Sequence, residues 1–206
     1  MAGMKEKIKK VAIHHFYKRG YFATGINDIA RSAGIQKSSI YYHYANKEDI
    51  LFDILETTME KLDANFEKYI RGKVSPEEQL KAAIEGHILF HVRWQKETLI
   101  SDSELRGLTA RNYKTILEMR DAYETKFQEI IRKGIEEGAF EDMDYKVASY
   151  GIITMCTSVA NWFRKSGRLK KEDIADIFNR ILLKGLEGGR MMRTIPFNQE
   201  ERRFSI

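Results

Sequence analysis

A short segment near the N-terminus concentrates side chains that suit contact with a polyanion. Residues 37–43 read KSSIYYH, so a lysine, two serines, two tyrosines and a histidine lie within one or two helical turns. If the segment is helical, its polar face presents Lys37, Ser38, Ser39, Tyr42 and His43. These short or flat hydrogen-bonding groups can enter the major groove of DNA and reach phosphates and base edges.

Other candidate chemistry in the chain is weaker. His87 and His91 stand four residues apart, a spacing that can suit a metal ion on one helix. No third ligand motif accompanies them, so pocket or helix-surface histidines are favoured over a metal site. The single cysteine, Cys156, excludes an intramolecular disulfide and a cysteine zinc cluster. Its apolar surroundings favour a buried, inert thiol over a redox sensor.

Sequence motifs for catalysis are missing as well. The chain contains no P-loop, no nucleotide-binding glycine loop, no G-x-S-x-G and no H-E-x-x-H. We therefore expect a protein that is not an enzyme and that holds neither a cofactor nor a metal.

The positive charge of the chain is confined to its first quarter. The 206 residues carry a net charge of +5. Residues 1–50 hold 9 basic and 4 acidic side chains, and the remaining residues hold 26 of each. Charge placed so unevenly indicates an anionic partner for the N-terminus and a different role for the rest.

No segment has the pattern of a membrane anchor. The longest uncharged apolar stretch, residues 147–163, is shorter than the ~20 residues that a membrane span needs. The basic run at the start is not followed by an apolar region, so a signal peptide is not expected. We expect a cytoplasmic protein without a membrane partner.

Helical periodicity extends along almost the whole chain, and strand signals are missing. Only two prolines occur, Pro76 and Pro196. The pattern predicts an all-α fold of about nine helices. They are expected at about residues 5–19, 26–33, 37–44, 47–71, 77–96, 101–107, 109–137, 144–165 and 171–186.

The second and third helices are predicted to form a helix-turn-helix. They are short and are joined through Ala33 and Gly34. Thr24 is a good N-cap candidate for the first of them. Ile29 and Ile40 can pack inward and fix the second short helix against the first, which leaves its polar face outward.

The segment TGINDIARSAGIQKSSIYYHYANKEDIL resembles the DNA-binding signature of the TetR/AcrR family of bacterial repressors. Matching residue types stand at matching spacing over about residues 8–53, including Ala33-Gly34-Ile35 and Lys47-Glu48. Gly25 and Gln36 depart from the usual pattern. The all-helical remainder is similar to that family's ligand-binding and dimerisation domain. The resemblance implies a DNA-binding domain over residues 1–50 and a second domain over 51–189. Residues 190–206 have a weak pattern and are expected to form a loosely ordered tail.

The resemblance also implies roles for individual residues. Residues 37–43 become the recognition helix of a DNA-binding domain that reads double-stranded operator DNA. The implied DNA contacts are Thr24, Lys37, Ser38, Ser39, Tyr41, Tyr42, His43 and Lys47.

The last two long helices carry apolar stripes that suit a homodimer interface, as in that family. An intramolecular core is the alternative explanation for the same stripes. The predicted interface residues are Val159, Phe163, Ile174, Ile177, Phe178, Ile181 and Leu182.

The middle helices carry aromatic and polar side chains that could line a ligand pocket, although aromatic residues at helical spacing are more often core. The candidates are Phe90, Trp94, Arg106, Tyr113, Arg120, Tyr123, Met155, Asn161 and Trp162. Residues 101–140 and 160–169 are similar to repressors of fatty-acid and sterol breakdown that respond to acyl-coenzyme A thioesters. That similarity implies an apolar tunnel with basic residues near its mouth, such as Arg106, Arg111, Arg164, Lys165 and Arg168. Solvated surface charge is an equal alternative.

The sequence therefore predicts a ligand-responsive transcriptional repressor that binds a palindromic operator as a dimer. A small-molecule effector, an acyl-CoA thioester or another elongated hydrophobic molecule, would release it. Two alternatives stay open: a multidrug-type repressor that senses hydrophobic cations, and a helical lipid carrier or enzyme that does not use DNA.

Overall fold

The computed structural model describes residues 2–186, and within them it contains ten α-helices, one short 3-10 helix and no strand. The prediction of an all-α fold is confirmed. The predicted tail over residues 190–206 lies outside the described residues. None of the helices in residues 2–186 is long and apolar enough to cross a bilayer.

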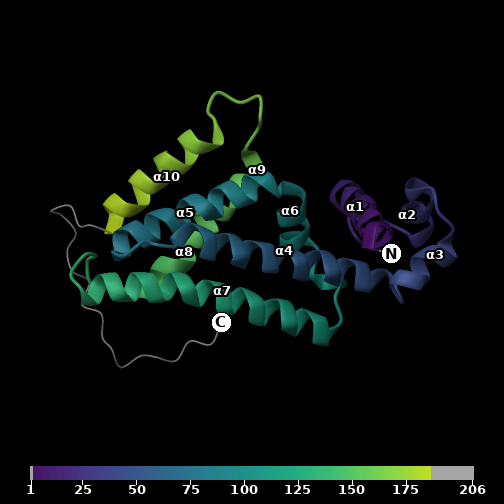
Figure 1. Cartoon of the computed structure of the whole chain (residues 1–206), viewed down its shortest axis with the longest axis horizontal. Helices are drawn as coiled ribbons and strands as arrows, with labels where there is room; N and C mark the ends of the chain where they lie inside the picture. Colours follow the sequence, from purple (N-terminus) through teal and green to yellow (C-terminus); the bar gives the residue numbers. More distant parts are fainter. Residues whose placement is uncertain (1, 187–206) are drawn as a thin grey trace.

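Three helices form the N-terminal end of the molecule (Figure 1): α1 (Ala2–Arg19), α2 (Ile26–Ala33) and α3 (Lys37–His43). Gly34 ends α2 in the left-handed conformation, with a φ of 62°. Its backbone N–H donates to carbonyls of the last turn of α2. Because this conformation costs glycine least, Gly34 sets the sharp angle between α2 and α3.

The N-cap of α2 differs from the sequence prediction. Gly25, not Thr24, holds the N-cap position, and the Asp28 carboxylate accepts the Gly25 N–H at 3.2 Å. The Thr24 hydroxyl instead donates to the Gly20 carbonyl at 2.8 Å. Thr24 is therefore buried in the turn that precedes the helix and does not cap it.

The long helix α4 (Lys47–Ile70) runs from this end of the molecule into the second bundle (Figure 1). Asn46 and Asp49 form a reciprocal capping box at its start. Its first half, including Ile50 and Leu55, is buried in the core of the N-terminal helices. Its second half, including Met59 and Phe66, is buried in the second core. One helix thus belongs to both hydrophobic cores.

The second bundle is built around α5 (Pro76–Arg93), which packs against α4, α7, α8 and α10. Its remaining elements are α6 (Gln95–Ser103), η1 (Leu105–Gly107), α7 (Ala110–Glu136), α8 (Tyr145–Thr157), α9 (Val159–Trp162) and α10 (Lys171–Leu186). Helix α6 also packs on α1 and α4. Figure 1 shows α6 beside α1, at the boundary between the two bundles.

Two predicted helices are interrupted in the structure. The segment 77–96 divides at Trp94, whose ψ of 40° breaks the helix between α5 and α6. The segment 144–165 divides at Ser158, whose hydroxyl donates to the Met155 carbonyl at 2.6 Å. A serine side chain that bonds the backbone locally competes with regular helix geometry. Neither interruption occurs at a glycine or proline, so the sequence contained no local signal for it.

Candidate functional site

Helix α3 is anchored on one side and open on the other. Ile40 is fully buried, whereas Tyr42 is 72% exposed and Tyr41 is 46% exposed. Lys37 and Ser38 are exposed, and Ser39 and His43 are half-buried. The Lys37 ammonium lies 5.6 Å from the centroid of the Tyr41 ring. The predicted polar face is therefore present at the surface of one short helix.

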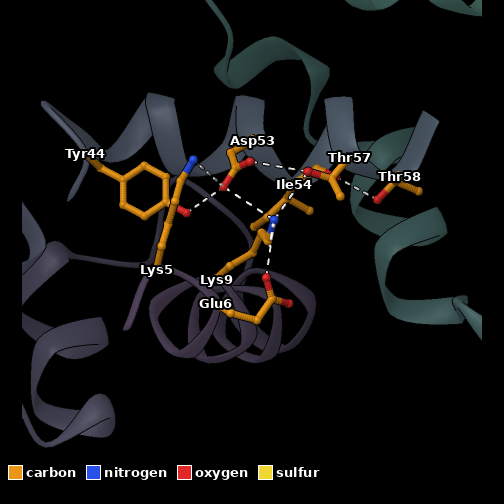
Figure 2. Close-up of polar contacts among 8 residues, drawn as sticks. All are labelled: Lys5, Glu6, Lys9, Tyr44, Asp53, Ile54, Thr57 and Thr58. Atoms are coloured by element: carbon orange, nitrogen blue, oxygen red, sulfur yellow. Dashed lines mark hydrogen bonds and ion pairs between the residues drawn. The ribbon is translucent and has the colours of Figure 1, made fainter. Parts of the chain in front are cut away.

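The C-terminal end of α3 is fixed by a carboxylate on α4 (Figure 2). The hydroxyl of Tyr44, the residue that ends α3, donates to Asp53 at 2.6 Å. The ammonium groups of Lys5 and Lys9, both on α1, each lie 3.5 Å from the same carboxylate. Thr57 donates to its other oxygen at 3.2 Å. Asp53 thereby ties α1, the end of α3 and α4 to one point.

The electrostatics of this contact favour the charged carboxylate. Burial alone raises the pKa of Asp53, but the Tyr44 hydrogen bond and the nearby Lys9 and Lys5 outweigh it. The net pKa lies below its ordinary value. Burial and the same carboxylate raise the pKa of Tyr44. Two of the lysines that contribute to the N-terminal charge are therefore partly neutralised inside the domain.

Lys47 and Thr24, both assigned to phosphates by the resemblance, have internal partners. The Lys47 ammonium donates to the carbonyls of Tyr21 and Thr24, each at 2.8 Å, and lies 4.1 Å from the centroid of the Tyr21 ring. Burial lowers the pKa of Lys47. One of its three N–H groups is not used by these two bonds. The Thr24 hydroxyl and backbone N–H are both already bonded within the turn, so this residue is not brought to the surface.

A set of contacts that we call the domain junction connects the N-terminal helices to the second bundle. Glu48, the second residue of α4, accepts hydrogen bonds from the Thr109 backbone N–H and from the Asn112 side chain, each at 2.8 Å. These two residues begin α7. Burial raises the pKa of Glu48, but the hydrogen bonds outweigh this and the net pKa is lowered.

Close packing reinforces the domain junction. A Cβ atom added to Gly107, in η1, would lie 2.6 Å from the Tyr21 ring and 2.9 Å from the Leu51 side chain. The aromatic ring of Tyr21 thus lies directly against the backbone of the second bundle. The Tyr21 carbonyl also accepts from Lys47, so η1 directly contacts the segment that precedes α2 and that holds Lys47.

The interior of the second bundle contains a polar cluster. His87 and His91 of α5 are buried, and their ring centroids lie 4.3 Å apart. The two His87 nitrogens lie 2.8 Å from the hydroxyls of Tyr123 and Thr157. Burial lowers the pKa of both histidines, to about 3 for His91. Residues 2–186 contain no group of three or more His, Cys, Asp or Glu that could hold a metal.

The predicted ligand residues are not brought into one place. Phe90 and Tyr123 are buried near the histidines, whereas Trp94 is half-buried beneath the Lys61 ammonium, 4.4 Å from the ring centroid. Arg120 donates to the Ser101 carbonyl at 2.7 Å and pairs with Asp102 at 3.7 Å. The remaining predicted ligand residues lie closer to the surface. Met155 is half-buried, and the exposed ones are Arg106, Tyr113, Asn161 and Trp162.

A surface groove of about 430 Å³ lies where α1, α6 and α9 meet. The residues that line it include Tyr17 of α1 together with Asn161, Arg164 and Lys165. Gln95 contributes to its wall and donates to the carbonyls of Ala160 and Phe163. Arg164 and Lys165, which were expected at the mouth of a ligand pocket, therefore lie beside this groove.

The predicted dimer residues divide into two groups. Val159, Phe163 and Ile174 are buried in the protomer's own core and have almost no surface left for a partner. Ile181 is 56% exposed. Ile177, Phe178 and Leu182 are half-buried.

Helix α8 has exposed apolar residues that were not among the predicted interface residues. Val147 and Tyr150 of α8 are 70% and 65% exposed. They continue with Gly151 and Thr154, which are also exposed, at the spacing of one helix face. The sequence hid this face, because residues 147–163 contain no charged side chain that would mark the solvent-facing side of the predicted helix.

Sequence reasoning also missed Asp53 and Glu48 as connectors and Ser101 as an interior polar group, and for His91 it left a pocket and the helix surface open. A heptad-like position on an apolar helix face was the available signal for His91, which follows Ile84 and Ile88. For the two carboxylates the sequence held no signal, since their partners lie on distant helices.

Comparison with known proteins follows the division into two bundles. Residues 8–54 match the model of bacterial regulatory proteins of the tetR family. Residues 73–186, more than half of the chain, match the model of the tetracyclin repressor-like C-terminal domain.

Individual relatives extend over nearly the whole chain. The HTH-type transcriptional repressor KstR2 of Mycobacterium tuberculosis is 27% identical over 87% of this chain and 91% of its own length. The fatty acid metabolism regulator protein of Bacillus subtilis is 26% identical over 87% of this chain and 95% of its own. A crystal structure of AibR with isovaleryl coenzyme A and operator DNA is 27% identical, with a TM-score of 0.81 over 87% of this chain and 98% of that one. The chain therefore belongs to the tetR family of bacterial regulatory proteins and is a DNA-binding transcriptional repressor of that type.

Proposed function

We propose that the protein is a homodimer that binds a palindromic operator and is released by an acyl-CoA thioester or another elongated hydrophobic effector. The observation that carries this proposal is the domain junction. Through Glu48, the domain that carries α3 is bonded directly to the first residues of α7. A ligand that displaces α6 or α7 thereby changes where α3 lies, and DNA affinity falls if the ligand prefers that displaced state.

The DNA contacts proposed are those on the open side of α3. Lys37, Ser38, Ser39, Tyr42 and His43 would face the major groove and its flanking phosphates. Tyr41 lies beside the Lys37 ammonium and would support it. Lys47 keeps one N–H for a phosphate, and its two carbonyl bonds would hold it in place.

The proposed dimer uses the outward faces of α8 and α10. A single recognition helix makes few contacts, so family members of this motif commonly bind two half-sites about one helical turn apart. Val147 and Tyr150 on α8 and Ile181 on α10 are exposed apolar side chains, and we propose that a second copy covers them.

Two features support an acyl-CoA rather than a cationic effector. The AibR structure contains isovaleryl coenzyme A. The groove at α1, α6 and α9 carries Arg164 and Lys165, which suit the phosphates of coenzyme A and would repel a cationic drug. Acyl-CoA and chromosomal DNA meet in the cytoplasm, and we propose that the protein acts there without a cofactor or membrane partner.

A helical lipid carrier or enzyme is the alternative from another class. The curated relatives named above are regulators, which favours the repressor. Binding of labelled promoter fragments, measured by fluorescence anisotropy, separates the two classes. The wild-type protein should bind a promoter fragment that contains a palindrome. A Lys37→Ala, Tyr42→Ala double variant should lose most of its affinity for that fragment while it still binds effector.

The effector is tested in the same assay. Isovaleryl-CoA and longer acyl-CoA thioesters should release the DNA, whereas free coenzyme A and a cationic dye should not. Release by the dye alone would favour the multidrug-type alternative. Equal DNA binding by wild type and double variant would overturn the assignment of α3.

A further inference from the structure

The polar cluster inside the second bundle is incompletely satisfied. His91 Nε2 and Ser101 Oγ are both buried and, among the contacts of residues 2–186, neither has a hydrogen-bond partner. Ser101 follows Thr98 by three residues on α6, so the two side chains share one face of the helix. Thr98 in turn contacts His91 at 2.8 Å. The two unsatisfied atoms therefore belong to the same region between α5 and α6.

The hydrogen bonds around Thr98 indicate whether His91 Nε2 is a donor or an acceptor. The Thr98 hydroxyl has one hydrogen and donates it to the Trp94 carbonyl at 2.9 Å. The arrangement that satisfies both contacts of the Thr98 hydroxyl is one in which His91 Nδ1–H donates to its oxygen. Burial holds the ring neutral by lowering its pKa to about 3. A neutral imidazole with a proton on Nδ1 carries none on Nε2, which is then an acceptor.

We propose that the effector carries a hydroxyl group, or an equivalent hydrogen-bond donor, and that it donates to His91 Nε2 beside Ser101. This inference rests on the proposed function, since it specifies the chemistry of the effector. The thioester carbonyl and a carboxylate are acceptors only and leave Nε2 unsatisfied. A hydroxyl can donate to Nε2 and accept from the Ser101 hydroxyl at the same time.

The site is also placed to act on DNA binding. The backbone carbonyl of Ser101 is held by Arg120 of α7 at 2.7 Å. Glu104 and Gly107, which face Gly20 and Tyr21 in the N-terminal domain, follow within six residues. A ligand that engages Ser101 thus acts on the segment that forms the domain junction.

The test compares pairs of ligands that differ by one hydroxyl. Hydroxyoctanoyl-CoA thioesters with the hydroxyl on the α, β or terminal carbon are compared with octanoyl-CoA by calorimetry on the full chain. At least one hydroxylated member should bind about tenfold more tightly than octanoyl-CoA, the scale of one buried acceptor gaining its partner. It should release operator DNA at a correspondingly lower concentration.

Two substitutions at His91 provide matched variants. His91→Asn keeps an amide donor near the position of Nδ1, for Thr98, but removes the acceptor at the position of Nε2. His91→Gln places an amide oxygen near Nε2 instead. The preference for the hydroxylated ligand should fall to near one in His91→Asn and persist in His91→Gln. A general packing defect would affect both ligands alike.

The outcomes separate this inference from the acyl-CoA proposal. If wild type binds both thioesters with equal affinity, or His91→Asn keeps the preference, water fills the site and the inference is overturned. If neither thioester binds, the free hydroxyoctanoic and octanoic acids are compared in the same way. A hydroxyl preference there, lost in His91→Asn, would retain the inference and reject coenzyme A. No preference with any pair would reject the inference as well.

Discussion

The Asp53 carboxylate on α4 binds side chains from α1 and from the end of α3, and its single negative charge lies near two lysines. Tyr44 donates to it from the end of α3, and Lys5 and Lys9 approach it from α1. Only 17% of its side chain is exposed, so the charge is not fully screened by water. We therefore expect Asp53 to affect DNA binding through the position of α3.

Replacing Asp53 by Asn tests this role. The amide keeps an acceptor for Tyr44 but removes the charge opposite Lys5 and Lys9. We expect the free energy of unfolding at pH 7 to fall by about 1–2 kcal/mol and operator affinity to fall several-fold. Urea unfolding and fluorescence anisotropy measure the two effects.

The pH dependence identifies the charge as the cause. The folded-state pKa of Asp53 is lowered, so its stabilisation is present above the unfolded value of ~3.9 and is lost as pH falls through the folded value. The difference between wild type and Asp53→Asn should therefore disappear in acid. Glu60→Gln, at an exposed site on the same helix, is the control. A pH-independent difference would argue for a shape effect instead.

The buried histidines give a second pH dependence, of a different range. In the unfolded chain they protonate with a pKa of ~6.5, whereas folded His91 stays neutral down to about 3. The unfolded state therefore binds more protons between these values, and stability falls as pH drops below ~6.5. Each such histidine contributes a slope of about 1.4 kcal/mol per pH unit.

His91→Gln removes one of these contributions without removing the polar group. Urea unfolding of wild type and variant at several pH values between 7.5 and 4.5 should give converging stabilities as the pH decreases, by roughly the slope of one histidine. Parallel curves would mean that His91 is protonated in the folded state.

At the scale of elements, the start of α4 is the connection through which the second bundle holds the recognition helix. Glu48 stands one residue from Lys47, which bonds the turn before α2. The same short stretch therefore contacts α7 on one side and the helix-turn-helix on the other. A rigid element that two sites both contact can couple them.

Glu48→Ala should weaken this coupling. Coupling in such systems is commonly about 5–150-fold in affinity, and we expect the effector-induced loss of operator affinity to shrink toward one in the variant. Effector affinity without DNA should change little. The measurement is operator affinity with and without saturating acyl-CoA.

A matched control for Glu48→Ala is Glu118→Ala, which removes an exposed carboxylate on α7 that is paired with Lys114. It should leave the coupling intact, since exposed pairs of this kind contribute little. Unchanged coupling in Glu48→Ala would show that the signal crosses the boundary elsewhere, for example through Gly107 and Tyr21.

The elements themselves were largely predictable, and the connections were not. Glycine at position 34, the polar run after it and the apolar faces of α4 and α5 are local signals, and they were sufficient to predict the helix-turn-helix. The division at Trp94 has no glycine or proline as a local signal, and the helix that follows it, α6, packs on the distant α1. The tautomer of His91 depends on a threonine in the next helix, which no periodicity reveals.

At the scale of the whole molecule, the exposed face of α8 and α10 determines the predicted assembly. A charge placed there does not disturb the protomer, since Tyr150 and Ile181 are exposed. It would be buried in the proposed dimer, where an unpaired charge is costly. Tyr150→Glu should therefore give a folded monomer in sedimentation experiments. Loss of bivalent binding should reduce operator affinity by about 10²-fold or more.

Val74→Glu is the matched control for this prediction. Val74 is 79% exposed and lies in the segment between α4 and α5, so it belongs to neither α8 nor α10. The control should remain dimeric. A dimer in Tyr150→Glu would place the interface on another surface.

The sharing of α4 between two cores has a consequence for protein engineering. The N-terminal core is completed by Ile100 of α6 and Ile116 of α7, which are fully buried against residues such as Ile54. A fragment that ends after the helix-turn-helix would expose this apolar surface. The DNA-binding domain is therefore not expected to fold as an independent unit. A chimaera that transfers its operator specificity to another sensor must carry α4 as far as Leu55, and must graft matching side chains onto the recipient's sixth and seventh helices.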